Sequence, residues 1–292
     1  MRVLVLLAIT VCGMGCSALL GIDDPSPDPG DDAPASDRLV FNLADFRMAQ
    51  LQSVRLHALL MLADGTMQDG TADARYASDN PAVAMVSTPG QIDAGSQSGM
   101  ATIRATIGVA QPATVKVMVT AKTCHPVINE LQTGSAVSSS DEWIEILNPC
   151  ITSTDVTGWT LVYRAANTTG TIDSNLMITL TGAMAPGELR LFAGQDFAGT
   201  SDDKWLGASG ILQQNNGAIA IRSGPKDVGP IVDAVAYGAV SPANPFIEGN
   251  PTPAMSNGRS AQRLPFDGHD DDDGAGDFML LTTTSPRALN AP

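Results

Sequence analysis

The chain has 292 residues, which is enough for one large domain or two of ordinary size. Its 28 glycines, 19 prolines and few aromatic residues are typical of many short strands joined by turns rather than of helical bundles. A formal net charge of −15 gives a surface that repels phosphate and argues against nucleic-acid binding. The composition therefore predicts an all-β protein with no nucleic-acid partner.

The N-terminal residues have the pattern of an export signal. Arg2 supplies a positive charge, and residues 3–11 form an apolar run that is too short to span a bilayer. The sequence Gly-Met-Gly-Cys at 13–16 resembles the lipobox of bacterial lipoproteins. This resemblance implies that residues 1–15 are a lipoprotein signal peptide and that Cys16 carries the lipid. The alternative is an ordinary secretory signal in which Cys16 is incidental.

The residues after Cys16 read as a tether. Residues 23–36 are rich in Pro, Gly and Asp and contain almost nothing apolar to bury, so residues 16–36 are predicted to be a lipidated, disordered N-terminus. Ser17 stands where lipoproteins of this type have Asp when they are retained in the inner membrane. The resemblance therefore implies an exported protein whose lipid anchor holds it to the outer membrane or cell surface.

Residues 37–121 carry the alternating pattern of half-buried strands. Apolar residues occupy every second position from Val54 to Leu62, and Asp64-Gly65 then predicts a turn. Alternation returns at 101–107 and 115–119, which are predicted as further strands of a sandwich. His57 falls on the polar face of the first strand and is interpreted as a solvated side chain rather than a ligand.

The middle of this segment also resembles a known family. The stretch from Tyr76 through Asn80-Pro81 to Ser87, followed by Gly90, Gly99 and Ala-Thr-Ile at 101–103, is similar to bacterial immunoglobulin-like domains of type 2. The resemblance implies an immunoglobulin-like β-sandwich over 37–121. Domains of this family are mostly spacers and adhesive stalks.

Residues 122–292 resemble a lamin-tail domain. The motifs occur in the family's order: Val-Ile-Asn-Glu-Leu at 127–131, Asp-Glu-Trp-Ile-Glu at 141–145, Ser-Ala-Gln-Arg at 260–263 and Ser-Pro-Arg-Ala-Leu-Asn at 285–290. The resemblance implies a second immunoglobulin-like sandwich. The fold prediction is therefore all-β, with two such modules after a signal peptide and a tether.

Cys124 and Cys150 are the cysteines that remain once Cys12 is removed with the signal and Cys16 is acylated. Export places them in an oxidising compartment, so they are predicted to form a disulfide that stabilises the fold by about 3 to 4 kcal/mol. The rival interpretation is a metal site that also uses His125.

A run of carboxylates between residues 267 and 278 is the most unusual local sequence. The candidate calcium ligands are the aspartates of this glycine-containing loop: Asp267, Asp270, Asp271, Asp273 and Asp277. The spacing does not match an EF-hand, because His269 and Leu280 occupy positions that need acidic ligands. Many lamin-tail domains carry a similar acidic loop, which implies a structural, solvated turn instead.

No arrangement in the sequence predicts catalysis. The three histidines are scattered, and there is no Gly-x-Ser-x-Gly motif. The acids Glu130, Asp141, Glu142 and Glu145 are interpreted as the solvent faces of strands. We therefore expect a non-enzymatic binding, adhesion or scaffold protein with a protein or surface polysaccharide as partner. The alternatives are an accessory subunit that localises a secreted hydrolase or envelope complex, and a calcium-dependent adhesin.

Overall fold

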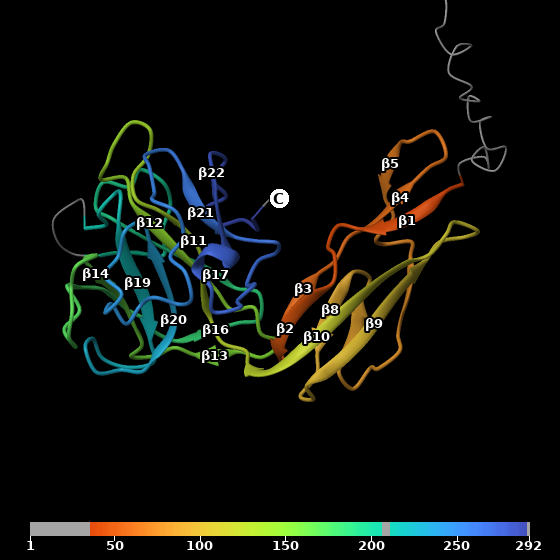
Figure 1. Ribbon diagram of the computed structural model, residues 1–292, viewed down its shortest axis with the longest axis horizontal. Coiled ribbons are helices and arrows are strands. Elements are labelled where there is room, and N and C mark those ends of the chain that lie inside the picture. Colours follow the sequence, from red (N-terminus) through yellow and green to blue (C-terminus); the bar gives the residue numbers. More distant parts are fainter. Residues whose placement is uncertain (1–35, 206–210, 291–292) are drawn as a thin grey trace, which may run out of the picture. The chain divides into compact units, whose positions relative to one another are not determined.

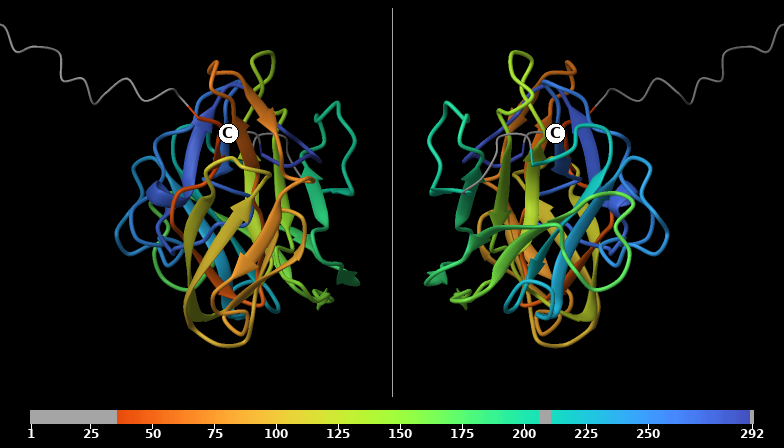
Figure 2. Two further views of the ribbon diagram at one scale, coloured as in Figure 1. Left: turned by 90° about the vertical axis from the view of Figure 1, so that its right-hand side faces the viewer. Right: turned by 90° about the vertical axis from the view of Figure 1, so that its left-hand side faces the viewer.

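A computed structural model describes residues 36–205 and 211–290, and nearly all of its regular elements are β-strands (Figure 1 and Figure 2). The helix α1 (Gly274–Asp277) is a single turn. The predicted all-β fold is therefore confirmed. The predicted signal peptide, the lipidation site at Cys16 and the tether lie outside the described residues. Within the described ranges, no helix has the length and apolar character needed to cross a membrane.

Residues 38–123 form three sheets, and their buried apolar residues fall into two clusters. Their strand orders are β2-β10-β9-β6, β3-β8-β7 and β1-β4-β5. Val117 and Ile103 of the first sheet share the core with Val54 and Ile92 of the second, so these two sheets pack face to face. The strands are β1 (Arg38–Phe41), β2 (Phe46–Gln50), β3 (Ser53–Arg55), β4 (Ala58–Met61), β5 (Met67–Asp69), β6 (Arg75–Ser78), β7 (Ala84–Thr88), β8 (Gln91–Ala94), β9 (Gly99–Thr106) and β10 (Ala113–Thr123).

The alternating run at 54–62 forms two strands rather than one. The chain leaves β3 at Leu56 and enters β4 at Ala58, where it changes from the sheet of β8 to the sheet of β1. The break is held by the Leu56 N–H, which donates to the Gly90 carbonyl at 2.7 Å. Gly90 has φ +79°, and a Cβ there would lie 2.5 Å from the Leu56 oxygen, so this approach needs glycine.

Residues 127–281 form two larger sheets and one strand pair, β13-β16. The orders are β18-β17-β12-β11-β21-β22 and β15-β14-β19-β20. The strands are β11 (Val127–Gln132), β12 (Trp143–Leu147), β13 (Thr154–Asp155), β14 (Thr160–Arg164), β15 (Asn175–Thr179), β16 (Ala183–Met184), β17 (Leu189–Ala193), β18 (Asp203–Lys204), β19 (Gly217–Arg222), β20 (Ile231–Tyr237), β21 (Ser260–Arg263) and β22 (Phe278–Leu281).

The two larger sheets enclose the main core of this part. Ile144 and Ile146 of β12 share it with Leu161 of β14 and Ile219 of β19. Every residue of β11 and β12 is buried, so both faces of these strands are covered. One face is the sandwich core, and the other carries polar side chains whose partners form part of the site described below.

Cys124 and Cys150 are joined in the structure, with their Cα atoms 5.6 Å apart. The bond links the residue after β10 to a residue shortly after β12, so the predicted pairing is present. The described residues from Ser36 onward group into one compact unit. A division of this unit into two domains at residue 121 stays a prediction.

Candidate functional site

A fully buried arginine, Arg263, contacts the acidic turn, which comprises residues 266–277. Arg263, the last residue of β21, donates from Nε to the Ile128 carbonyl at 2.6 Å and from Nη1 to the His269 carbonyl at 2.7 Å. Its Nη2 donates to Oδ1 of Asp233 on β20, and Nη1 lies 3.3 Å from Oδ2 of Asp277. A buried guanidinium is stable only when it is paired in this way. Arg263 therefore joins three strands to the turn.

The predicted calcium ligands do not converge on one point. Oδ1 of Asp267 accepts from Nδ2 of Asn129 at 2.7 Å, while Oδ1 of Asp273 accepts from the Asn250 N–H at 2.8 Å. Asp277 instead accepts from the Asp271 N–H at 3.0 Å, so it folds the turn onto itself. Most of these carboxylates are thus hydrogen-bond acceptors that hold backbone segments in place.

Two smaller groups of metal-ligating atoms do form, and each mixes predicted and unpredicted residues. His269, Asp271 and Asp277 make one group, while Asp233, Glu248 and Asp270 make the other. Within each group the ligand atoms lie within 4.8 Å of one another. Calcium usually takes six to eight oxygen ligands, and each group offers three donor residues. Calcium binding stays a prediction at this turn.

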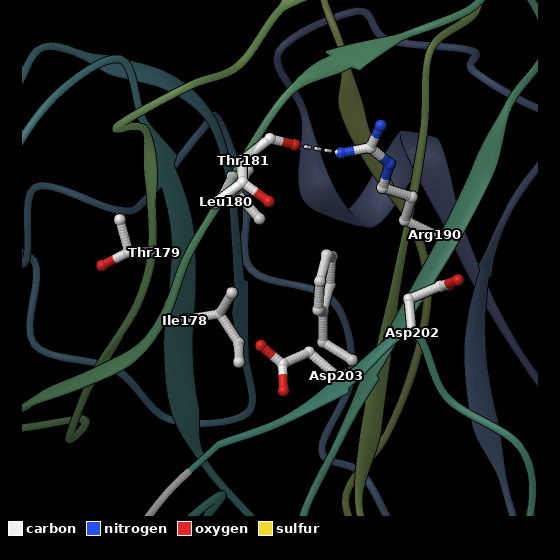
Figure 3. A pocket seen from close by; sticks show the side chains of 8 residues that line it. Ile178, Thr179, Leu180, Thr181, Arg190, Asp202 and Asp203 are labelled. Atoms are coloured by element: carbon white, nitrogen blue, oxygen red, sulfur yellow. Dashed lines mark hydrogen bonds between the residues drawn. The ribbon is translucent and has the colours of Figure 1, made fainter.

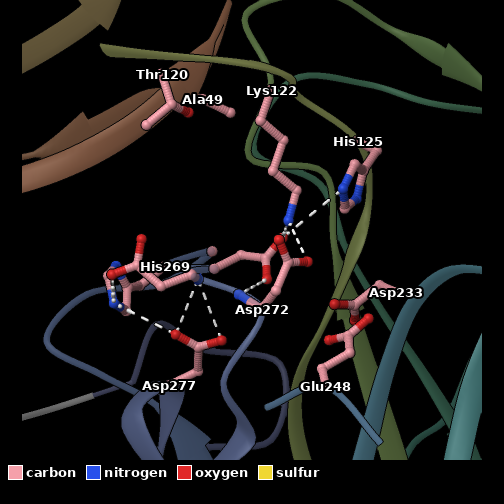
Figure 4. Close-up of polar contacts among 12 residues, drawn as sticks. Ala49, Thr120, Lys122, His125, Asp233, Glu248, His269, Asp272 and Asp277 are labelled. Carbon is pink, nitrogen blue, oxygen red and sulfur yellow. Dashed lines mark hydrogen bonds and ion pairs between the residues drawn. The ribbon is translucent and has the colours of Figure 1, made fainter. Parts of the chain in front are cut away.

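Protein cations already neutralise the second group. Nζ of Lys122, on β10, lies 2.5 Å from Oδ2 of Asp270 and 2.8 Å from Oδ1 of Asp272 (Figure 4). Burial opposes ionisation of Asp270, but the charges of Arg263 and Lys122 lower its pKa below the usual value. Asp270 is therefore a carboxylate whose counter-ions are an ammonium and a guanidinium from its own chain.

The pKa of Glu248 is shifted in the opposite direction from that of Asp270. Burial and the negative charges of Asp233 and Asp270 raise the pKa of Glu248 to about 9, so this side chain is protonated at neutral pH. Its Oε1 accepts from the Ala234 N–H at 3.1 Å. Protonation of Glu248 leaves Asp233 and Asp270 as the charged acids of this group, and Arg263 and Lys122 are their cations.

The turn also contacts residues of the N-terminal sheets. Phe266 belongs to the core formed by residues 43–119, and its ring lies 5.4 Å from that of Phe46, edge to face. Nε2 of Gln52 donates to the Gly268 carbonyl at 2.8 Å. The side chain of Asp270 is 9% exposed, whereas those of Asp271 and Asp272 are 44% and 62% exposed, so part of the turn is held in contacts and part is solvated.

Two buried glutamates face each other on β11 and β12. Glu130 and Glu145 are paired across the strands, and both are fully buried. Oε2 of Glu130 accepts from Oγ of Ser285 at 2.8 Å, and Oε2 of Glu145 accepts from the Arg287 N–H at 2.6 Å. The expectation that these acids form a solvent face is wrong, because residues 285–290 cover them.

The environment of Glu145 disfavours its charge. Burial and the nearby carboxylate of Glu130 raise the pKa of Glu145 to about 8. Its Oε1 has no hydrogen-bond partner within the described part of the chain. Glu142, the neighbouring acid, accepts from the N–H groups of Ile211 and Leu212. These acids therefore anchor backbone from distant segments.

A small cavity of about 290 Å³ opens between β15, β17 and β18 (Figure 3). Arg190 borders it, yet its guanidinium donates to the carbonyls of Thr181 and Ala183 at 2.7 and 2.6 Å. Asp202, on the same rim, pairs with Arg287 at 2.8 Å. The charged groups of Arg190 and Asp202 at the rim of this cavity are thus paired with other groups of the protein.

Four members of this site, Arg263, Lys122, Asp233 and Glu248, were not singled out from the sequence. Arg263 lies within a recognised motif, but a motif does not reveal that it forms an ion pair with Asp233, 30 positions away. An apolar strand such as β20 that contains one aspartate is a usable signal, because a buried carboxylate needs a partner.

Comparisons with known proteins give little further information. No protein-family model matches the sequence, and no curated protein matches it. The structure is similar to the crystal structure of a DUF4876 family protein from Bacteroides thetaiotaomicron, with 11% sequence identity and a TM-score of 0.39. The match covers 87% of this chain and 96% of that chain. A similarity of this size supports no conclusion about function.

Proposed function

We propose that the chain is an exported lipoprotein, anchored through Cys16, that acts as a non-catalytic scaffold or binding module at the outer membrane or cell surface. Residues 37–121 serve as an immunoglobulin-like stalk, and residues 122–292 serve as a lamin-tail module that the stalk presents.

The observation that supports this proposal is that the side chains of the acidic turn make contacts within the protein. Its carboxylates contact Arg263, Lys122 and backbone N–H groups, and its Phe266 enters the core of the N-terminal sheets. Such contacts stabilise the connection between successive sheets, which is what a stalk with a presenting module requires. A fold alone does not define function, so the anchor and the partner are tested separately.

The anchor is tested by metabolic labelling with an alkyne-tagged palmitate, followed by membrane fractionation. We expect wild-type protein to be labelled and to sediment with the outer membrane, and Cys16→Ala to lose both properties. Cys12→Ala is the matched control, because this cysteine lies within the predicted signal peptide and its replacement should leave labelling intact. An unlabelled wild-type protein that still sediments would contradict the lipid anchor.

The scaffold role is distinguished from that of an accessory subunit by cross-linking in intact cells and purification from envelope extracts. An accessory subunit should recover one hydrolase or envelope complex in fixed proportion. A scaffold or binding module should instead retain an external ligand and recover no such fixed partner.

A further inference from the structure

Three segments meet at one end of the sheet β15-β14-β19-β20 and form an open pocket of about 510 Å³. They are the residues after β14, the start of β15 and the residues before β19. The strand register brings them together, because Tyr163 pairs with Asn175 and Arg164 pairs with Ala218. Loops at the end of a sandwich are a common place for ligand sites, and this volume is within the usual range for small ligands.

Carboxamides dominate the polar lining of this pocket. Asn167, Asn175, Gln213 and Asn216 all border it. Among the residues that the structure describes, none of these four side chains forms a hydrogen bond with another protein group. Each therefore keeps a free acceptor oxygen and a free NH₂ donor at the pocket surface.

The backbone beneath these amides is held in place. Oη of Tyr163 accepts from the Gln213 N–H at 3.3 Å, and Oη of Tyr237 donates to the Gln213 carbonyl at 2.8 Å. On the opposite side, Oγ of Ser174 accepts from the Ala165 N–H at 3.0 Å. A fixed backbone reduces the entropy lost when the side chains order around a ligand.

The tyrosine contacts also require a glycine at the start of β19. A Cβ at Gly217 would lie 2.7 Å from the Tyr163 ring and 2.8 Å from Oη of Tyr237. The close packing of both rings against this backbone therefore maintains the base of the pocket.

The chemistry of the lining selects an uncharged, hydroxyl-rich ligand. Among the described residues that border the pocket none is charged, although the chain as a whole carries −15. A carboxamide offers an acceptor oxygen and a donor nitrogen bonded to one carbon, and neighbouring hydroxyl groups of a sugar ring present a donor and an acceptor that match this pair. Ala166 and Ile211 add small apolar surfaces for the C–H face of such a ring.

We propose that this pocket binds a neutral saccharide unit of a glycan. The proposal rests on the binding role given above and supplies its ligand class. Asn175 and Asn216 are the principal hydrogen-bonding residues, because both are half-buried and lie beside the paired strands.

The test is isothermal titration of the full-length protein with maltotetraose, cellotetraose and the tetramer of N-acetylglucosamine. A hyaluronan tetrasaccharide and an uncharged Gly-Ser-Asn peptide are the acidic and peptide probes. We expect at least one neutral oligosaccharide to bind, and Asn175→Ala with Asn216→Ala to weaken binding by about tenfold or more. Gln97→Ala, which removes an exposed carboxamide between β8 and β9, is the control and should bind normally.

Nuclear magnetic resonance gives a second measurement that does not depend on affinity alone. The side-chain NH₂ signals of Asn175 and Asn216 should shift on addition of the bound oligosaccharide, and those of Gln97 should not. Binding of the acidic or peptide probe alone, absence of binding to all three neutral probes, or binding that the double variant leaves unchanged would overturn the assignment. Membrane association is measured independently with Cys16→Ala, so failure of the saccharide proposal leaves a separate result for the anchor.

Discussion

Replacing Arg263 with methionine should destabilise the protein severely. The guanidinium is fully buried, and its loss leaves Asp233 without its cation and removes the donors to the Ile128 and His269 carbonyls. Removing one partner of a buried ion pair lowers the free energy of unfolding by about 3 to 5 kcal/mol, and the two carbonyls left without a hydrogen-bond donor add to this loss. We therefore expect a loss of about 4 kcal/mol in the free energy of unfolding.

The assay is calorimetric unfolding, in which a loss of this size lowers the transition by about 10 °C for a unit of this length. Arg104→Met is the matched control, because Arg104 is exposed on β9 and its replacement should cost less than about 0.5 kcal/mol. Adding Asp233→Asn to Arg263→Met should cost less than the sum of the two single changes, because the two residues share one interaction. Equal transitions for Arg263→Met and Arg104→Met would refute the role given to the buried guanidinium.

The remaining predictions concern pH, the disulfide and calcium. The pKa of Glu145 is raised from 4.5 to about 8, so the stability that this side chain contributes is present below pH 4.5 and is lost as pH rises through 8. Urea titrations should show that the free energy of unfolding declines between these pH values and that Glu145→Gln reduces the decline. A decline that Glu145→Gln leaves unchanged would contradict this. Reduction of the bond between Cys124 and Cys150 should cost about 3 kcal/mol in urea unfolding and have no effect on a protein carrying Cys124→Ser and Cys150→Ser. Because Lys122 and Arg263 already pair with Asp270 and Asp277 of the turn, the calorimetric transition should coincide in calcium and in chelator. A rise of several degrees in calcium that Asp271→Asn and Asp273→Asn abolish would instead support the calcium hypothesis.

Local patterns predicted much of the strand structure. Alternation at 101–107 and 115–119 corresponds closely to β9 and β10, because one face of each strand is buried and the other is not. The same alternation did not reveal the break between β3 and β4. A change of sheet keeps the burial of alternate side chains, so Leu56 and Ala58 are both buried on either side of the break.

The polar site was harder to predict, because its contacts join residues far apart in the chain. Glu130 and Glu145 were expected on a solvent face, but contacts with residues far along the chain, among them Gln262, Ser285 and Arg287, bury them. The acidic run at 267–278 was open to interpretation as a calcium site or as a solvated turn, because the sequence does not show which cations contact its carboxylates. Its cations are Arg263, on the preceding strand, and Lys122, which lies 148 residues before Asp270.

Phe266 has a consequence for any attempt to separate the two halves of the chain. This ring lies in the turn after β21 but packs into the core between β2 and its neighbours, where it is 8% exposed. A fragment that begins at residue 122 would present this ring to water, and a fragment that ends at residue 121 would have a vacant space beside Phe46. Each half should therefore be prone to self-association on its own, and mixing the two should restore solubility.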